Sequence, residues 1–573
     1  MFALVNPTPL ENPRLIAHSE DVSRNLLEVD IEAEGLEKAS RLLAGNDPGF
    51  GRPAAHCYCG HQFGVFAGQL GDGATMYIGE TVNSKGERWE IQFKGAGLTP
   101  FSRSADGRKV LRSSIREFLC SEHLHALGVP TTRALSICTS DSTVVRDILY
   151  DGHPRRERCA VIIRVAETFI RFGSFEIARP PDQMSGRAGP NWRKNPEIVK
   201  QLCTYVMTHF YPQVEGRVED FLLEVATRTA SLCALWQTYG WCHGVLNTDN
   251  MSILGKTLDY GPYGFMERFD PHFVCNRSDD QGRYEYEAQP SVCLWNCLKL
   301  VEALALTGNV LPYQEKEAVQ AFAIRIKDAF LKEYRERYHE RMLEKLGLAK
   351  STIEDQRNKQ IELIEDLFKV MNRTAADFTQ LFRALSKMDA ASSPQQNFSR
   401  HIRPCLGTVA ELQNVLKPRY DARQIKMLVE LVDQGKGDEV LNATGLSPAD
   451  VRAEANRIDL YSSSSVWSEA EKSRRDEEEW VRWLGRYTEF PKVENRVATM
   501  NRVNPRFVLR NHVAQRAISK AERGDFEELN YVLRLCTRPF DDDDALYVSK
   551  TDGFRYDAPS EDIEEACAVS CSS

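Results

Sequence analysis

The stretch from Trp241 to Ile253 is the sequence feature that most constrains the fold of this chain. It places one His, two Asn and one Asp within eight residues, from His243 to Asn250. An amphipathic run at 218–238 precedes it, and Asp259 follows nine residues after Asn250, in the order Asp-Tyr-Gly. Polar residues grouped this densely between apolar segments indicate a functional site that the rest of the chain serves.

The order of these residues matches part of the protein-kinase pattern. Kinases carry a catalytic loop H-R-D-L-x-x-x-N and then D-F-G, in which the Asn and the second Asp hold the metal ions bound to ATP. His243, Asn250 and Asp259 take the positions of the His, the Asn and the second Asp. Val245 stands where the catalytic Asp belongs, and Asp249 lies beside the Asn instead. Two interpretations stay open: a dead kinase, or a kinase-like site with different chemistry.

A glycine-rich segment at 68–74 precedes a predicted hairpin at 75–94. Glycine lets backbone N–H groups approach phosphate oxygens closely, although such a cluster is also typical of an ordinary turn. The hairpin ends at Lys94, and a predicted helix from Ser114 carries Glu117. In a kinase N-lobe the corresponding Glu pairs with the Lys and fixes it on the phosphates. Ser114-x-x-Glu117 also fits a capping box, but we favour the ion pair with Lys94.

Two arginines, Arg164 and Arg171, stand seven positions apart in an apolar context. On a helix this spacing is two turns, which would place both side chains on one face. Buried guanidinium groups are costly unless they meet an anion, so the pair indicates an anion-binding surface. Solvated surface arginines are the alternative. The segments 131–139 and 158–165, of which the second contains Arg164, predict strands.

The remaining chain predicts helices with few breaks, because apolar residues recur at helical spacing. We therefore predict an α+β protein with a protein-kinase-like bilobal fold, a mixed β-rich N-lobe, a large α-rich C-lobe and a helical C-terminal extension. The predicted segments are an N-terminal extension (1–50), the N-lobe with the glycine loop (51–180), the C-lobe with the catalytic loop (181–400), the helical extension (401–537) and an acidic, flexible tail (538–573).

Charge and cysteine content limit the classes of function. The chain has 73 Lys and Arg against 82 Asp and Glu, and its net charge of −9 argues against a nucleic-acid partner. It shows no apolar run long enough to span a membrane and no signal peptide at its start. Fifteen cysteines scattered through apolar segments indicate a reducing compartment with buried thiols rather than a disulfide framework.

Five stretches together give the chain a resemblance to the selenoprotein O family of kinase-like proteins over almost its whole length. They are Gly60-His61-Gln62-Phe63-Gly64, Gly68-Gln69-Leu70-Gly71-Asp72-Gly73, Arg112-Ser113-Ser114-Ile115-Arg116-Glu117-Phe118, His243-Gly244-Val245-Leu246-Asn247-Thr248-Asp249-Asn250-Met251-Ser252 and Asn504-Pro505-Arg506-Phe507. The resemblance implies a kinase-like fold and transfer of AMP from ATP to Ser, Thr or Tyr hydroxyls of protein substrates. It also implies that the nucleotide is reversed relative to ordinary kinases, so that the α-phosphate faces the acceptor.

The resemblance implies a role for each residue of the site. Asp249 is the catalytic base, Asn250 and Asp259 hold Mg²⁺ or Mn²⁺, and Glu117 is the partner of Lys94. The residues implied to bind ATP are Gly71, Gly73, Ala74, Lys94, Asp106, Gly107, Arg164, Arg171 and Asp259.

The chemistry of the implied reaction agrees with these residue types. Attack at the α-phosphate makes pyrophosphate the leaving group, and the forked guanidinium groups of Arg164 and Arg171 can stabilise its charge. A different position of the acceptor also removes the need for an Asp at Val245. Asp249 is then the local carboxylate that can accept the hydroxyl proton.

Two positions depart from the family pattern. Ala74 stands where many relatives carry Arg, so one phosphate contact is missing. Cys571 stands where some relatives carry selenocysteine. Cys567 and Cys571 could form a redox pair if the backbone allows it, and incidental thiols in a disordered tail are the alternative.

The resemblance also gives expectations for partners and location. We expect a monomer that binds ATP and hydroxyl-bearing protein substrates, in the mitochondrion by likeness to eukaryotic relatives and otherwise in the cytoplasm. A conventional protein kinase and a catalytically inactive nucleotide-binding pseudokinase scaffold are the alternative functions.

Overall fold

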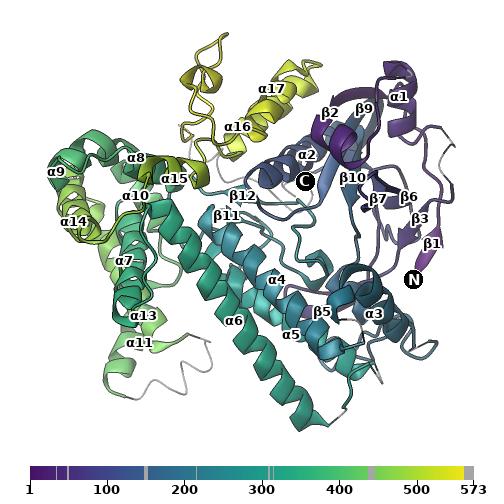
Figure 1. The fold of residues 1–573 in the computed structure, drawn as a ribbon, viewed down its shortest axis with the longest axis horizontal. Coiled ribbons are helices and arrows are strands. Elements are labelled where there is room, and N and C mark those ends of the chain that lie inside the picture. The colour runs from purple at the N-terminus through teal and green to yellow at the C-terminus, as the bar shows by residue number, and fades with distance from the viewer. Residues whose placement is uncertain are drawn as a thin grey trace. The chain divides into compact units, whose positions relative to one another are not determined.

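One antiparallel sheet dominates the N-terminal third of the chain (Figure 1). The structure is a computed structural model that describes residues 1–33, 35–47, 49, 51–147, 152–195, 197–214, 216–307, 310–313, 315–435 and 446–560. Within these residues the sheet has eight strands, with β8 (Lys109–Val110) paired to β10. The main path is β1 (Phe2–Leu4), β3 (Ala54–His56), β6 (Thr75–Val82), β7 (Arg88–Lys94), β10 (Arg155–Ala166), β9 (Arg133–Arg146) and β2 (Arg14–His18). Segments from the first eighteen residues therefore form both edges of the sheet.

Helix α2 (Leu111–Ala126) packs against β9 and β10 (Figure 1). Its apolar residues Leu111, Ile115 and Phe118 recur at helical spacing and are buried. A second apolar cluster, which includes Phe93, Val161, Ile163 and Leu43 of α1 (Leu36–Leu43), is built from the alternate residues of β7 and β10. Because successive side chains of a strand point to opposite faces, the sheet has apolar residues on both faces.

The chain divides into two compact units. The first comprises Met1–Phe265, Val274–His339 and Phe507–Ser573, and the second comprises Met266–Phe273 and Glu340–Arg506. Besides α1 and α2, the longer helices of the first unit are α3 (Glu197–Phe210), α4 (Val218–Thr238), α5 (Gln289–Leu306), α16 (Asn511–Glu522) and α17 (Glu527–Cys536). The boundary falls within α6 (Lys316–Leu346). The helices of the second unit are α7 (Glu354–Arg373), α8 (Phe378–Ser386), α9 (Pro394–Asn397), α10 (Val409–Val415), α11 (Ala422–Asp433), α13 (Pro448–Ser464), α14 (Glu469–Glu489) and α15 (Arg496–Val503).

The coarse prediction of a β-rich first part and an α-rich second part is confirmed. Helices α16 and α17 pack against α2, so part of the C-terminal segment belongs to the unit that contains the sheet. Residues 538–560 include the short helical turn η8 (Asp544–Tyr547), and Tyr547 and Tyr556 are buried in the core of that unit. Cys567 and Cys571 lie outside the described residues. Among the described helices, none has the length and apolar composition needed to cross a lipid bilayer.

The strands predicted at 131–139 and 158–165 are confirmed as β9 and β10. Arg164 therefore lies on β10, and Arg171 directly precedes the short helical turn η2 (Phe172–Glu176), so the helical spacing considered for this pair does not apply. Helix α2 begins at Leu111, so Ser114 lies inside the helix and does not cap it. The helix predicted from Ser114 thus begins earlier than expected, and the capping box, the alternative use of Ser114 and Glu117, does not form.

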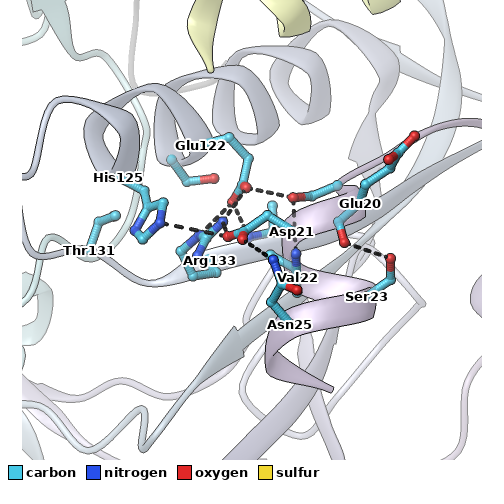
Figure 2. Close-up of polar contacts among 12 residues, drawn as sticks. Glu20, Asp21, Val22, Ser23, Asn25, Glu122, His125, Thr131 and Arg133 are labelled. Atoms are coloured by element: carbon cyan, nitrogen blue, oxygen red, sulfur yellow. Dashed lines mark hydrogen bonds and ion pairs between the residues drawn. The ribbon is translucent and has the colours of Figure 1, made fainter. Parts of the chain in front are cut away.

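A buried ion cluster joins the N-terminal segment to α2 and β9 (Figure 2). Arg133 of β9 donates to both carboxylate oxygens of Glu122 of α2, from Nε at 3.0 Å and from Nη2 at 2.7 Å. The same Nη2 lies 2.7 Å from Oδ2 of Asp21, and Ser19 donates to Glu122 at 2.7 Å. Glu122 and Arg133 are both almost fully buried. The residues around position 20 are thus fixed to the sheet by paired charges.

Replacing Glu122 with alanine is expected to lower the free energy of unfolding by about 3 kcal/mol. The change leaves the buried Arg133 with Asp21 alone, and an incompletely paired buried charge is strongly destabilising. Denaturant unfolding of the intact chain measures the effect. The matched control is Glu20→Ala, which removes an exposed pair with Arg24 and should change the stability by less than about 1 kcal/mol. Equal stability of the two variants would contradict the prediction.

Candidate active site

A small, strongly polar cavity of about 170 Å³ lies between the sheet and the Asp259 segment, within the first unit. Its lining residues are Tyr58, Asp72, Gly73, Ala74, Thr75, Gln92, Lys94, Glu117, Thr132, Arg164, Phe169, Arg171, Leu258 and Asp259. The register of the sheet explains part of this set, because Gln92 pairs with Arg164 across β7 and β10, and Lys94 is two residues from Gln92 on β7. Residues two apart on a strand share a face, so Gln92, Lys94 and Arg164 point the same way.

Glu117 is the centre of a cluster of cations. The Nζ atoms of Lys94 and Lys109 lie 3.0 Å and 3.1 Å from its Oε2, and Nε of Arg164 lies 3.3 Å from its Oε1. Burial by itself would raise the pKa of Glu117, but the three cations outweigh burial and lower this pKa to about 2. Glu117 is therefore ionised at neutral pH, and it holds Lys94 at the cavity.

Asp259 completes the ion network on the opposite side of Lys94. Its Oδ1 lies 3.1 Å from Nζ of Lys94, and its side chain is 40% exposed. The charge of Lys94 is the main cause that holds the pKa of Asp259 well below its ordinary value. Its φ of +62° is uncommon for a residue with a side chain and marks a backbone held in a strained conformation. Asp259 is thus an ionised carboxylate at the cavity.

Asn250 has the arrangement expected of a metal ligand. Its Nδ2 donates to the carbonyl oxygen of Val245 at 3.0 Å, which assigns the amide orientation and leaves Oδ1 as an acceptor. A carboxylate oxygen and an amide oxygen are donors that suit Mg²⁺, which takes few protein ligands and completes its shell with phosphate and water. The donor atoms of Asn250 and Asp259 are thus of the chemical kind that such a cation takes, although only Asp259 is in the cavity lining.

Contacts of His243 with buried aromatic side chains and with the main chain hold the start of the catalytic loop in place. His243 is buried against Trp236 and Trp241, and its Nε2 lies 3.0 Å from the carbonyl oxygen of Leu258. Its main-chain N–H donates to Gln289 at 2.8 Å. Burial lowers the pKa of His243, so it is neutral and structural at physiological pH.

Asp249 lies in the short helical turn η4 (Thr248–Asn250), next to the cavity but not in its lining. It is buried, and burial raises the pKa of Asp249 to about 7, against the opposing effect of Arg171. Gln62 donates to its Oδ2 at 3.2 Å. A carboxylate with a pKa near neutrality is suited to accept a proton at physiological pH.

Arg171 joins the cavity to the catalytic loop. Its Nη1 donates to the carbonyl oxygen of Asp249 at 2.9 Å, and its guanidinium lies 4.3 Å above the ring of Tyr58. Nη2 lies 3.9 Å from the buried carboxylate of Asp72. Nε is buried and has no hydrogen-bond partner among the described residues. An unpartnered donor on a buried guanidinium indicates that an anion can bind there.

The guanidinium of Arg164 makes more hydrogen bonds to the protein than that of Arg171. Besides Glu117, its Nη1 donates to Ser121 at 2.8 Å, and its Nη2 donates to the hydroxyl and carbonyl oxygens of Thr132 at 2.6 and 2.9 Å. Both arginines line the same cavity, although the helical spacing that led us to pair them does not exist. Strand β10 and the turn that follows it bring them together instead.

Three residues implied to bind ATP lie outside the cavity lining. Gly71 has a φ of +149°, and a Cβ at this position would come within 2.5 Å of the ring of Phe101. The carboxylate of Asp106 receives both terminal nitrogens of Arg146, at 2.6 and 2.7 Å. Gly107 packs closely against the backbone of Gly97.

Sequence reasoning missed Lys109, Asp72 and Tyr58. Lys109 reaches Glu117 because β8 pairs with β10, and no motif predicts such a contact. Burial lowers the pKa of Lys109 and raises that of Asp72. The position of Asp72 within the glycine-rich segment was a usable signal, since a lone carboxylate there needs a partner when it is buried.

Comparison with known proteins decides the family. The sequence profile of Protein adenylyltransferase SelO matches residues 1–537. The chain belongs to the SelO family of protein adenylyltransferases. It is 45% identical to "Protein adenylyltransferase SelO, mitochondrial" of Mus musculus over 564 residues, which cover 94% of this chain and 82% of the relative. It is equally similar, with the same coverage, to the protein of that name from Homo sapiens.

Bacterial relatives are also similar along nearly their whole length. The chain is 37% identical to "Protein nucleotidyltransferase YdiU" of Enterobacter sp. (strain 638) over 556 residues, 96% of this chain and 94% of the relative. Membership of the SelO family makes this chain a nucleotidyltransferase that uses ATP to adenylylate proteins. The resemblance read from the five sequence stretches is confirmed.

Proposed function

We propose that this SelO protein transfers AMP from ATP to Ser, Thr or Tyr hydroxyls of protein substrates, with Asp249 as the base. The observation that carries the proposal is the group of Lys94, Arg164, Arg171 and Asp259 around one cavity, with Asp249 directly beside it. The fold that supports it is a protein-kinase-like pair of lobes, the β-rich 51–180 and the α-rich 181–400.

The cavity fits the polyphosphate end of the nucleotide. Its lining carries cationic side chains, and its volume of about 170 Å³ suits phosphate groups better than a whole nucleotide. Lys94 would contact phosphate while Glu117 holds it, and the Nε of Arg171, which has no partner among the described residues, is a donor available to a phosphate oxygen. Gly73 and Ala74 supply the adjoining glycine loop. In the reversed orientation the terminal phosphates meet the arginines, and pyrophosphate leaves against fixed cations.

Asn250 and Asp259 would hold a divalent cation, Mg²⁺ or Mn²⁺, which when bound supplies charge stabilisation for the phosphates. The carboxylate of Asp259 would face both the cation and the ammonium of Lys94, which lies 3.1 Å from its Oδ1. Lys94 remains paired with Glu117 and is available to phosphate. Asp249 accepts the proton of the attacking hydroxyl, and Arg171 keeps the main chain of Asp249 in place.

Adenylylation and phosphorylation leave different atoms on the acceptor, and labelled ATP distinguishes them. With ATP, metal and acceptor protein, α-labelled ATP is expected to label the protein, and γ-labelled ATP is expected to leave it unlabelled. Analysis of the label after limited digestion should give AMP on a hydroxyl. Transfer of the γ-label would instead indicate a conventional kinase, and no transfer of either label would indicate a nucleotide-binding scaffold.

The transfer rate is expected to rise with pH through the titration of Asp249. Because burial raises the pKa of Asp249 to about 7, a large share of the carboxyl is protonated below this pH and cannot accept a proton. A cation at Asn250 favours the ionised form, so the acid limb should lie at or below pH 7. Single-turnover rates at saturating ATP and metal measure it, and a flat profile between about pH 5 and 8 would contradict the assignment.

The names of the mouse and human relatives support a mitochondrial location for this protein as well. We further propose that it acts as a monomer. The remaining segments of the proposed organisation are the extension 1–50, the helical extension 401–537 and the acidic tail 538–573. A redox pair of Cys567 and Cys571 stays a proposal for that tail.

A further inference from the structure

A β-hairpin packs on the catalytic loop. The residue before it, Tyr58, lines the nucleotide cavity, whereas the residues of the hairpin itself are not among the lining residues. The hairpin consists of β4 (Cys59–Gln62) and β5 (Val65–Gln69), joined through Phe63 and Gly64. The stretch Gly60-His61-Gln62-Phe63-Gly64, one of those that carry the family resemblance, forms β4 and the turn. The implied nucleotide and metal residues do not account for this stretch.

Three hydrogen bonds join this hairpin to the catalytic loop. The main-chain N–H of His61 donates to Oγ1 of Thr248 at 2.8 Å. The N–H of Phe63 donates to Oδ1 of Asn247 at 3.3 Å, and Nε2 of Gln62 donates to Oδ2 of Asp249 at 3.2 Å. The end of β4 and the first residue of the turn thus contact three consecutive residues of the loop, which holds the hairpin on it.

A buried polar network lies under the same contact. Nδ1 of His61 lies 2.6 Å from Oε1 of Glu176, and Oγ1 of Thr248 donates to Oε2 of Glu176 at 2.8 Å. All three side chains are almost fully buried. A buried carboxylate with partners on both oxygens resists displacement, because each lost contact leaves a desolvated group. Glu176 therefore locks β4 and the catalytic loop to the end of η2.

The two carboxylate oxygens of Asp249 have unequal surroundings. Oδ2 accepts from Gln62, whereas Oδ1 is buried and has no hydrogen-bond partner among the described residues. Gly60 lies against Oδ1, and a Cβ at this position would come within 2.5 Å of it. Both oxygens thus lie against β4, and Oδ1 is the one that no donor among the described residues occupies.

We propose that Gln62 is a positioning residue for the transfer reaction: it holds the carboxylate of Asp249 through Oδ2 and leaves Oδ1, which has no donor from the described part of the chain, to take the hydroxyl proton. His61 and Glu176 support it by fixing β4 on the loop, and Gly60 leaves room for the carboxylate. The inference rests on the proposed role of Asp249 as the base. Gln62 is not in the cavity lining, so its effect belongs to the chemical step and not to ATP binding.

The test uses Gln62→Met, which keeps the length of the side chain and removes the amide donor. Gln62 is partly exposed, so the variant should fold. We expect kcat for transfer of the α-label to fall roughly 10- to 100-fold, the effect of one hydrogen bond to a charged group, with KM for ATP unchanged. Combined with Asp249→Asn, the same change should cause no further fall, because residues that act as a unit are non-additive.

Two further variants sharpen the result. Gly60→Ala should also lower kcat, since its methyl group displaces the carboxylate of Asp249. Gln201→Met, on the exposed face of α3, is the matched control and should leave kcat unchanged.

The outcomes separate this inference from the proposed function. If Asp249→Asn is slow but Gln62→Met is as fast as the parent, positioning by Gln62 is wrong and the role of Asp249 stands. An equal further fall on the Asp249→Asn background would show that Gln62 acts elsewhere, which also overturns the inference. If Asp249→Asn transfers at the parent rate, both the base assignment and the inference are wrong.

Discussion

Asp259→Asn is expected to reduce transfer of the α-label by about 10³-fold, because it removes a charge from the proposed metal site and one of the two carboxylate partners of Lys94. A bound cation supplies several kcal/mol of stabilisation to transferring phosphates, and each 1.4 kcal/mol corresponds to a tenfold change in rate. Asp259 is an ionised carboxylate on the cavity, and its Oδ1 lies 3.1 Å from Nζ of Lys94. Its asparagine variant keeps one oxygen ligand, so a higher metal concentration should restore part of the activity.

Single-turnover transfer at several metal concentrations measures this effect. Asp141→Asn is the matched control, because Asp141 pairs with Arg14 at the surface of the same unit, away from the cavity. Thermal unfolding of both variants shows whether the fold is preserved. An Asp259→Asn protein that transfers at the parent rate, without a shift in its metal requirement, would contradict the assignment.

Asp249→Asn is expected to reduce transfer by about 10²–10⁴-fold, the usual contribution of a positioned general base. The asparagine has nearly the same shape and can keep the contact with Gln62 through its oxygen, but it cannot accept the hydroxyl proton. Because Asp249 does not line the cavity, ATP should bind the variant with the affinity of the parent. Loss of rate without loss of binding separates a base from a residue that shapes the nucleotide site.

Calorimetric titration with ATP and metal measures binding, and release of α-label to protein measures the rate. The acid limb of the pH profile should also disappear in this variant, since the titrating carboxyl is gone. A variant with weakened ATP binding and an unchanged rate at saturation would show that Asp249 binds the nucleotide and is not the base.

Local patterns in the sequence were sufficient for much of the fold. The amphipathic run predicted at 218–238 is helix α4, because apolar residues at helical spacing produce one continuous buried face. The hairpin that ends at Lys94 is β6 and β7, where glycine and polar residues mark the intervening turn. Such elements depend on residues close together in the chain, so they can be predicted from the sequence without knowledge of the tertiary structure.

The position of the two arginines shows where local patterns fail. Seven residues apart on a helix share a face, but seven apart on a strand point to opposite faces, so spacing alone could not pair Arg164 with Arg171. They meet in the cavity because the chain turns after β10 ends at Ala166. Both arginines do line one cavity, but helical spacing is not the reason.

By itself, the sequence determined the family, the reaction class and the candidate residues of the catalytic loop. The stretch from His243 to Ser252 is specific enough to identify the family from the order of its residues alone. Tertiary structure alone decided that Lys109 shares Glu117 with Lys94, that Arg146 occupies Asp106, and that Gln62 holds one oxygen of Asp249. These contacts join residues from 8 to 187 positions apart, and strand register and side-chain burial bring such residues within hydrogen-bonding distance.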